Sequence, residues 1–321
     1  MTITRRDFLQ LSAYGFGAVL LSACGVTEDR KIIRQPNLTP TVVTQALKEL
    51  GFASFANQLK THQDGQYLYV ESNGMPAHPM MIGIKSWQQQ VPVPQAYTSN
   101  NAWKIPLHPV VAEHPVSAKT SLYRGAIALA VNGVPIFNAL NNRGEDALLA
   151  GELDQWGGHA GRADDYHYHT APLHLEAVVG KGNPIAYALD GFPIYGSSEA
   201  DGSEITMLDE FNGHFAKDGS YHYHGTTTYP YINGGMRGVV TIQSDQIEPQ
   251  PHTRPFRDAL QPLRGATITD FQTLADNAYS LEYQINGNKY FVNYIMRGNT
   301  WHFEFIDATG NKTVETYTTQ P

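Results

Sequence analysis

The chain has 321 residues, a formal net charge of −8 at pH 7, 41% hydrophobic residues and one cysteine. This composition is typical of a soluble globular protein, and the 29 glycines and 19 prolines predict a chain with many turns. The mildly acidic balance argues against nucleic acid as a partner and against a basic lipid-binding face.

The N-terminal segment resembles a bacterial export signal. Residues Thr4–Leu9 contain an arginine pair similar to the twin-arginine signal, and the apolar stretch Leu11–Leu21 is too short to span a bilayer as a stable helix. This stretch ends in Leu21-Ser22-Ala23-Cys24, which resembles a bacterial lipobox. A buried apolar helix with an incidental cysteine is the alternative interpretation.

We therefore expect residues 1–23 to be a signal peptide and Cys24 to be acylated, which makes membrane lipid a partner. The position after the cysteine holds Gly25 and the next holds Val26, with no Asp that would favour inner-membrane retention. The expected location is the periplasmic face of the cell envelope, on the outer membrane rather than the inner. The twin-arginine route carries folded proteins and often serves proteins that acquire a metal before export.

Two regions follow the signal in this prediction. Residues 24–65 are expected to form a lipid-anchored linker with one helix over Thr41–Leu50, ended by Gly51. From residue 66 to residue 245, short β runs alternate with loops rich in Gly, Pro and Asn. This pattern predicts a mainly β domain with a sandwich or barrel-like sheet.

The β region contains a duplicated histidine motif. The segment 153–169, which runs from Leu-Asp through Gly-His to Tyr-His-Tyr-His, reappears without a gap 55 residues later as segment 208–224. Of the 17 aligned positions, 8 are identical, and three of these are histidines. Duplication of one structural unit is the simplest cause of this pattern.

The spacing of the histidines predicts metal binding. Alternate side chains of a β-strand share a face, so the two histidines of each Tyr-His-Tyr-His run project together, away from the tyrosines. A third imidazole lies eight residues upstream and can return on a neighbouring strand. Three neutral imidazoles suit zinc or copper, and a three-histidine site with an open fourth position is typical of catalytic zinc. The candidate ligands are His159, His167 and His169 in the first copy and His214, His222 and His224 in the second.

Three further residues are candidates for the same chemistry. Asp154 and Asp209 occupy matching positions and could serve as a fourth ligand, as a carboxylate that orients an imidazole, or as a catalytic acid or base. His78 follows an Asn-Gly-Met-Pro sequence that is a weaker relative of the repeat. Whether the two copies form two sites or share one is open, and a hydrogen-bonded ladder of Tyr and His without metal is the alternative.

A turn and an apolar strand precede each copy of the motif. Residues 132–138 and 190–196 share the form Asn/Asp-Gly-x-Pro-Ile-aromatic, offset by 58 residues. Asn-Gly and Asp-Gly favour tight turns with positive φ, so each segment predicts a hairpin turn that leads into a strand.

Together these motifs resemble the YHYH domain family of secreted and envelope proteins, over roughly residues 66–243. The resemblance implies no settled activity. Many relatives are similar in having a Cys where this chain has Trp156 and Phe211. The departure leaves histidine as the main ligand type here and puts a thiolate ligand or a disulfide in doubt.

The C-terminal part is expected to be a separate unit. Residues 246–257 contain three prolines and predict a linker, and residues 258–321 predict a small α+β module, with a helix over Ile268–Ala275 packed on four antiparallel strands. By analogy, such a module could bind another envelope protein. The four predicted strands are Tyr279–Ile285, Lys289–Met296, Thr300–Asp307 and Lys312–Tyr317.

Three classes of function remain open from the sequence. The first is an exported, lipid-anchored metal-binding protein that handles zinc or copper or acts as an envelope binding protein. The second is a metal-dependent hydrolase or oxidase with an open three-histidine site. The third is a structural or protein-interaction module without metal. No Ser-His-Asp motif, phosphate loop or dinucleotide fingerprint in the sequence competes with the metal interpretation.

Overall fold

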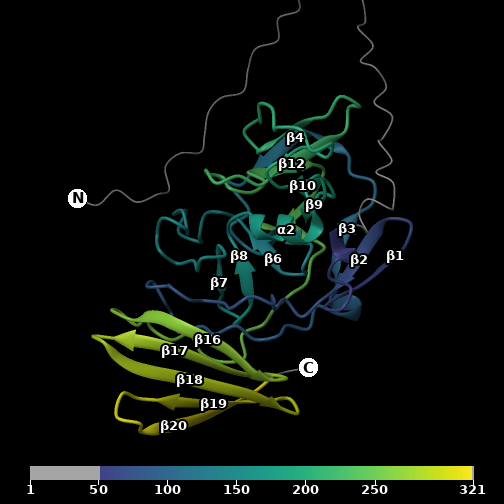
Figure 1. Cartoon of the computed structure of the whole chain (residues 1–321). Helices are drawn as coiled ribbons and strands as arrows, with labels where there is room; N and C mark the ends of the chain where they lie inside the picture. Colours follow the sequence, from purple (N-terminus) through teal and green to yellow (C-terminus); the bar gives the residue numbers. More distant parts are fainter. Residues whose placement is uncertain (1–50, 320–321) are drawn as a thin grey trace, which may run out of the picture. The chain divides into compact units, whose positions relative to one another are not determined.

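The computed structural model describes residues 51–319, and these residues form a mainly β fold (Figure 1). The predicted signal peptide, Cys24 and the helix over Thr41–Leu50 lie outside the described residues. Residues 51–53 are helical, so Gly51 lies within a helical turn and not after a helix end, where it was expected. Among the described residues, no helix is long and apolar enough to cross a membrane.

The central element is an eight-stranded sheet built from two similar halves. Its strand order is β11-β12-β10-β9-β5-β6-β8-β7. Each half contains a hairpin of two strands. The strand that carries Tyr-His-Tyr-His pairs in parallel with the second strand of the hairpin on one side, and antiparallel with a strand that carries Gly-His on the other. The antiparallel pair β5–β9 joins the halves, which confirms the predicted duplication. The strands are β5 (Ala126–Ala130), β6 (Pro135–Phe137), β7 (Gly158–Ala160), β8 (Tyr166–Tyr168), β9 (Pro184–Ala188), β10 (Pro193–Tyr195), β11 (Gly213–Phe215) and β12 (Tyr221–His224).

The two hairpins form where the sequence predicted turns. Gly133 and Gly191 have φ values of +80° and +93°. A Cβ atom on Gly133 would lie 2.6 Å from the Cβ of Ser72, and one on Gly191 would lie 2.5 Å from the carbonyl oxygen of Pro106. Only glycine therefore fits these turns without strain. Strands β5 and β9 are buried along their whole length, as expected for continuous apolar runs at the centre of a sheet.

Smaller elements surround the central sheet. Their hydrophobic residues join its residues in one buried cluster, which includes Phe52, Trp103, Tyr187 and Tyr223. The elements are β1 (Lys60–Gln63), β2 (Tyr67–Glu71) and β3 (Trp103–Pro106) in one sheet; the pair β4 (Val111–Ser117) and β13 (Gly235–Gly238); the pair β14 (Thr241–Gln243) and β15 (Gln246–Glu248); and the short helices η1 (Ser99–Asn101), η2 (Leu173–Leu175) and α2 (Glu176–Val179).

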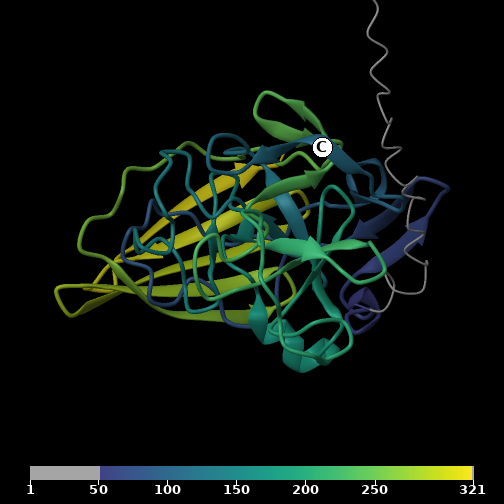
Figure 2. The same ribbon diagram turned by 90° about the horizontal axis from the view of Figure 1, so that it is seen from above.

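The C-terminal residues form a five-stranded antiparallel sheet, seen as the yellow-green and yellow strands running side by side in Figure 2. The predicted helix over Ile268–Ala275 is wrong, because these residues belong to the first strand. Its pairing register shifts between Ile268 and Asp270. This bulge lets Ile268 and Phe271, three residues apart, both be buried, a spacing that imitates a helical face. The strands are β16 (Thr267–Ala275), β17 (Ala278–Ile285), β18 (Asn288–Arg297), β19 (Thr300–Ile306) and β20 (Lys312–Thr318).

The segment expected to be a linker is packed against the rest of the chain. Ile247 and Gln250 are buried, and the side chain of Gln250 both donates to and accepts from the backbone of Ala126. At the end of this segment, Arg257 donates two hydrogen bonds of 2.6 Å to the buried carboxylate of Asp164. Residues 246–257 thus contribute several buried side chains to the packing of the chain, which a free linker would not do.

Candidate metal centres

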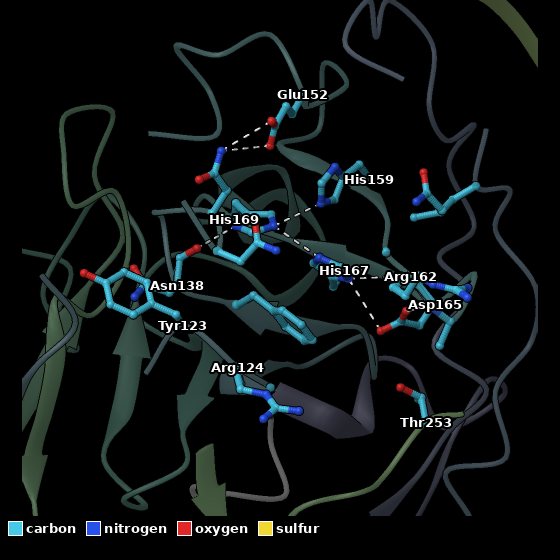
Figure 3. Close-up of a pocket in the computed structure, with 18 of the residues that line it drawn as sticks. Tyr123, Arg124, Asn138, Glu152, His159, Arg162, Asp165, His167, His169 and Thr253 are labelled. Carbon is cyan, nitrogen blue, oxygen red and sulfur yellow. Dashed lines mark hydrogen bonds and ion pairs between the residues drawn. The ribbon is translucent and has the colours of Figure 1, made fainter. Parts of the chain in front are cut away.

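The first histidine triad forms on paired strands at one end of the eight-stranded sheet. Strands β7 and β8 are antiparallel, with His159 opposite His167. His169 lies two residues after His167 and projects from the same face. The Nε2 atom of His169 lies 3.1 Å from the Nε2 atoms of both His159 and His167 (Figure 3). The predicted strand and the predicted convergence of the three imidazoles are therefore present in the structure.

Backbone carbonyl groups set the orientation of these rings. The Nδ1 atom of His167 lies 2.9 Å from the carbonyl oxygen of Asp165, and that of His169 lies 2.5 Å from the carbonyl oxygen of Asn138. A carbonyl oxygen only accepts hydrogen bonds, so each Nδ1 carries the proton and each Nε2 presents a lone pair to the common centre. Two such acceptors 3.1 Å apart repel unless a cation lies between them.

The environment of His159 and His169 keeps these two rings neutral. Burial, with a smaller contribution from His167, lowers the pKa of His169 to about 3. Burial also lowers the pKa of His159 well below its usual value, and both neighbouring histidines lower it further. The neutral imidazole is the form that binds metal, so at neutral pH no proton must be removed from these two rings.

The second triad repeats this geometry at the other end of the sheet and adds a carboxylate. His214 lies opposite His222 on β11 and β12, and their Nε2 atoms are 2.9 Å apart. One oxygen of Glu199 lies 3.1 Å from Nε2 of His214. The other lies 3.0 Å from Nε2 of His222 and 3.5 Å from Nε2 of His224. The four side chains together can supply three nitrogens and one oxygen to a metal ion.

Two polar atoms of the second site are buried without a hydrogen-bond partner. They are Nε2 of His224 and Oε1 of Glu199, whose contact with His214 lacks hydrogen-bond geometry. Burial lowers the pKa of His224 to about 4. Burial raises the pKa of Glu199. The hydrogen bond with His222 and the electrostatic effect of the three histidines lower it by a larger amount in total, so this pKa lies below its usual value. Unpaired buried donors and acceptors are costly, and a metal ion would satisfy both atoms.

The repeated Pro-Ile-aromatic segments position both triads. Asn138 and Gly196 directly follow β6 and β10, and their carbonyl oxygens lie 2.5 Å and 3.3 Å from Nδ1 of the last histidine of each triad. The aromatic residues before them also contact the rings: Phe137 stacks on His167 at 3.9 Å, and Tyr195 packs edge-on against His222 at 5.3 Å. The role of these segments as support for the imidazoles was not foreseen from the sequence.

The structure does not bring Asp154 and Asp209 to either triad. One oxygen of Asp154 accepts from the backbone N–H groups of Trp156 and Gly158, and the other accepts from the hydroxyl of Tyr166 at 2.8 Å. Asp209 makes the matching bonds, including one of 2.8 Å from the hydroxyl of Tyr221. The tyrosines project from the strand face opposite the histidines, so a carboxylate that binds them lies on the wrong side to be a ligand.

His78 also lies apart from the triads. Its Nε2 atom is 2.8 Å from the hydroxyl of Tyr168, and its ring stacks on Trp156 at 4.6 Å. Both contacts place it on the tyrosine side of β8.

Glu199 is the residue that the sequence analysis missed. It lies 15 residues before His214, in the loop after β10. Counting from the repeated Asp-Gly and Asn-Gly turns, its position corresponds to Asn141 in the first copy, 58 residues earlier. Because the matching position of the first copy holds Asn and not an acidic residue, the repeat gave no signal that Glu199 would be a ligand candidate.

The first triad lies in a cavity of about 650 Å³ (Figure 3). All three of its histidines line this cavity, and no carboxylate of residues 51–319 joins them as a fourth ligand. A metal ion held here would keep an open coordination position, whereas the second site supplies a fourth protein ligand.

The comparison with known proteins supports the resemblance seen in the sequence. Residues 102–207 match the family model described as YHYH protein. The match covers about a third of the chain, so the chain is similar to the YHYH family over these residues. The match is shorter than the expected 66–243; it includes the first triad and Glu199 and ends before the second triad. No curated protein and no solved structure matches this chain.

Proposed function

We propose that this protein is an exported metal-binding protein that holds one transition-metal ion in each half of its duplicated sheet. The observation that carries the proposal is the convergence of three Nε2 atoms in both halves, at separations of 2.9–3.1 Å for the close pairs. Nitrogen-rich sites of this kind suit zinc or copper. In the first half the carbonyl contacts leave the Nε2 atoms of His167 and His169 as facing acceptors, whereas a purely structural ladder would direct an N–H donor of one ring at an acceptor of the next.

The proposal includes location and role. The twin-arginine-like segment and the lipobox at Cys24 support export in a folded, metal-loaded state, followed by acylation and anchoring in the envelope. Such a protein would handle metal at the periplasmic face, and the C-terminal sheet would offer a surface for an envelope protein partner. The anchor is tested by sedimenting membranes and measuring how much protein pellets with them. Wild-type protein should pellet, and the Cys24→Ser variant should remain in the supernatant.

Metal stoichiometry tests the central claim. Wild-type protein, freed of metal and then loaded with zinc, should hold two equivalents. His169→Ala and His224→Ala should each hold one, because the two groups of ligands are separate. The control is His302→Ala, since His302 lies on β19 outside both groups. A wild-type protein without stoichiometric zinc or copper, or loss of both equivalents in one single variant, would contradict the proposal.

A metal-dependent enzyme is the second candidate, and the open first site favours it. The cavity gives a substrate access to a metal with a free coordination position, as in hydrolytic zinc centres. Hydrolase or oxidase activity arising there would be lost in His167→Ala and retained in His222→Ala. Activity that survives in His167→Ala would exclude the first site as its source.

A further inference from the structure

The charged side chains of the cavity differ in whether they are neutralised. Five of them are arginines or carboxylates: Arg124, Arg143, Arg162, Glu152 and Asp165. Arg143 forms ion pairs with both Glu145 and Glu152, so its single positive charge is shared between two carboxylates. Asp165 accepts a hydrogen bond from the backbone of Ala163 and lies 3.7 Å from Nδ1 of His167. Glu152 is thus paired with an arginine, whereas Asp165 keeps its negative charge on the Nδ1 side of His167.

Two arginines of the cavity have no acidic partner. Within residues 51–319, Arg124 forms no hydrogen bond or ion pair, and Arg162 donates to a carbonyl oxygen, that of Arg257, at 3.0 Å. Both side chains are exposed at the cavity. In Figure 3 the triad lies between Glu152 on one side and Arg124 on the other, with Arg162 beside His167. A divalent metal on the three imidazoles would add two positive charges beside these two arginines.

The second half of the sheet shows which group is missing from the first. There Glu199 supplies an anionic oxygen among the three histidines. At the corresponding position of the first half, Asn141 is turned to its own loop: its amide donates to Glu152, and its side-chain oxygen accepts from the backbone of Arg143 and Glu145. The first site therefore has the nitrogen ligands of the second but no protein oxygen.

From this asymmetry we infer that the first site binds a small organic anion whose oxygen takes the metal position that Glu199 takes in the second site. The inference rests on the proposed metal binding. Arg124 and Arg162 attract the anion and hold its remaining oxygens, since guanidinium groups match the geometry of carboxylate and phosphoryl oxygens. The cavity has the volume of a small-molecule site, and Trp87 and Phe137 give it apolar surface for the carbon part of the ligand.

Cobalt spectroscopy on the full chain tests this inference. Cobalt(II) replaces zinc in sites of this kind and reports changes in its ligands through its visible absorption. His214→Ala confines cobalt to the first site, and this protein is titrated with acetate, with methylphosphonate and with acetamide, the neutral analogue of acetate. Acetate or methylphosphonate should change the spectrum saturably, and acetamide should not; the stronger of the two anions identifies the headgroup as carboxylate or phosphoryl.

Arginine variants on the same background assign the charge. Arg124→Gln should weaken anion binding by roughly 10- to 100-fold, the effect of losing a charge-assisted hydrogen bond. Arg297→Gln removes an equal charge from the exposed end of β18, away from the cavity, and should leave binding unchanged. Equal weakening by both variants would show a net-charge effect and overturn the inference.

The outcomes separate this inference from the proposal beneath it. If cobalt binds to the His214→Ala protein but no anion alters its spectrum, the anion site is excluded and metal binding stands. If cobalt does not bind, both fail. A cobalt spectrum that responds equally in a His167→Ala protein, where the second site remains with Glu199 in place, would put the anion at the wrong site and also overturn the inference.

Discussion

At the scale of single residues, Asp154 and Asp209 do not join the histidine clusters; they accept hydrogen bonds from the tyrosines and turns on the opposite strand face. Asp154 is buried and accepts four hydrogen bonds, from the hydroxyl of Tyr166 and from the backbone of Met81, Trp156 and Gly158. Burial raises the pKa of this carboxyl, although all four bonds lower it. Its role is to fix the turn that brings His159 back beside β8.

Asp154→Asn separates this role from that of a ligand. The amide of Asn donates where the carboxylate accepts, so at least two buried donors lose their acceptor. We expect the free energy of unfolding to fall by about 2–4 kcal/mol. Zinc stoichiometry, measured well below the unfolding temperature, should stay at the wild-type value. Loss of one equivalent in a folded Asp154→Asn protein would instead make Asp154 a ligand.

The buried histidines predict how stability depends on pH. In the folded, metal-free protein the pKa values of His169 and His224 are lowered to about 3 and about 4, whereas 6.5 is usual for an unfolded chain. As pH falls below about 6.5, the unfolded state takes up protons before the folded state, so unfolding becomes more favourable. The stability is present above pH 6.5 and is lost progressively toward pH 3–4.

Urea unfolding of metal-free protein at pH 7 and pH 5 measures this loss. The unfolding free energy should be lower at pH 5, and the difference should shrink in a His169→Gln, His224→Gln protein. A difference that is absent in the wild type, or as large in the double variant, would contradict the assignment. Metal affinity should fall over the same range, because the ligands must be neutral.

At the scale of elements, the duplicated unit is a hairpin, a support for the imidazoles and a strand pair that carries them. Its two tight turns, at Gly133 and Gly191, decide where β6 and β10 begin. Through the carbonyl groups of Asn138 and Gly196, these strands in turn orient the last histidine of each triad. A change in the geometry of either hairpin should therefore alter the orientation of the last histidine in the corresponding triad.

Alanine substitutions at the turns should show this dependence. Gly133→Ala and Gly191→Ala each combine a positive φ with a clash, against Ser72 and Pro106 respectively, and should lower the unfolding free energy by about 2–4 kcal/mol. Gly144→Ala is the matched control: its φ is +76°, but its Cβ meets nothing within 4 Å, so the cost should be about 1 kcal/mol. Equal costs at all three positions would remove the clash from the explanation.

At the scale of the whole described chain, buried polar contacts connect the C-terminal sheet to the cavity region. The ion pair of Arg257 and Asp164 lies next to Asp165, whose carbonyl orients His167. Tyr294 on β18 donates to the carbonyl oxygen of Pro92 at 2.7 Å, and the guanidinium of Arg257 lies over the ring of Phe303. The C-terminal sheet thus packs behind the loop that supports the first triad.

Breaking the ion pair should be costly. Arg257→Ala leaves the carboxylate of Asp164 buried without its partner, and the unfolding free energy should fall by about 3–5 kcal/mol. In the Arg257→Met, Asp164→Asn double variant no charge is left unpaired, so part of this loss should be recovered. Thermal unfolding at fixed pH measures both. If the double variant loses as much unfolding free energy as the Arg257→Met and Asp164→Asn single variants lose together, the two side chains act independently.

The sequence was sufficient where local pattern and periodicity decide structure. The duplication, the hairpin turns, the alternating faces of Tyr-His-Tyr-His and the grouping of six histidines all follow from spacing along the chain, because strand geometry places alternate residues on one face. It misled at β16, where a bulge gave Ile268 and Phe271 a helical spacing, because a bulge depends on pairing with β17.

Only the tertiary structure decided what completes each site. Their matching positions in the repeat predicted Asp154 and Asp209 as ligands. In the structure both carboxylates bind tyrosines on the strand face opposite the imidazoles. Glu199 reaches the second triad from a loop, and the first triad meets a cavity where Glu199 has no counterpart. Loop paths and long-range packing are set by the whole fold. The sequence therefore identified the six histidines that converge, and the structure determined which cluster also receives a carboxylate, Glu199, and which faces a cavity.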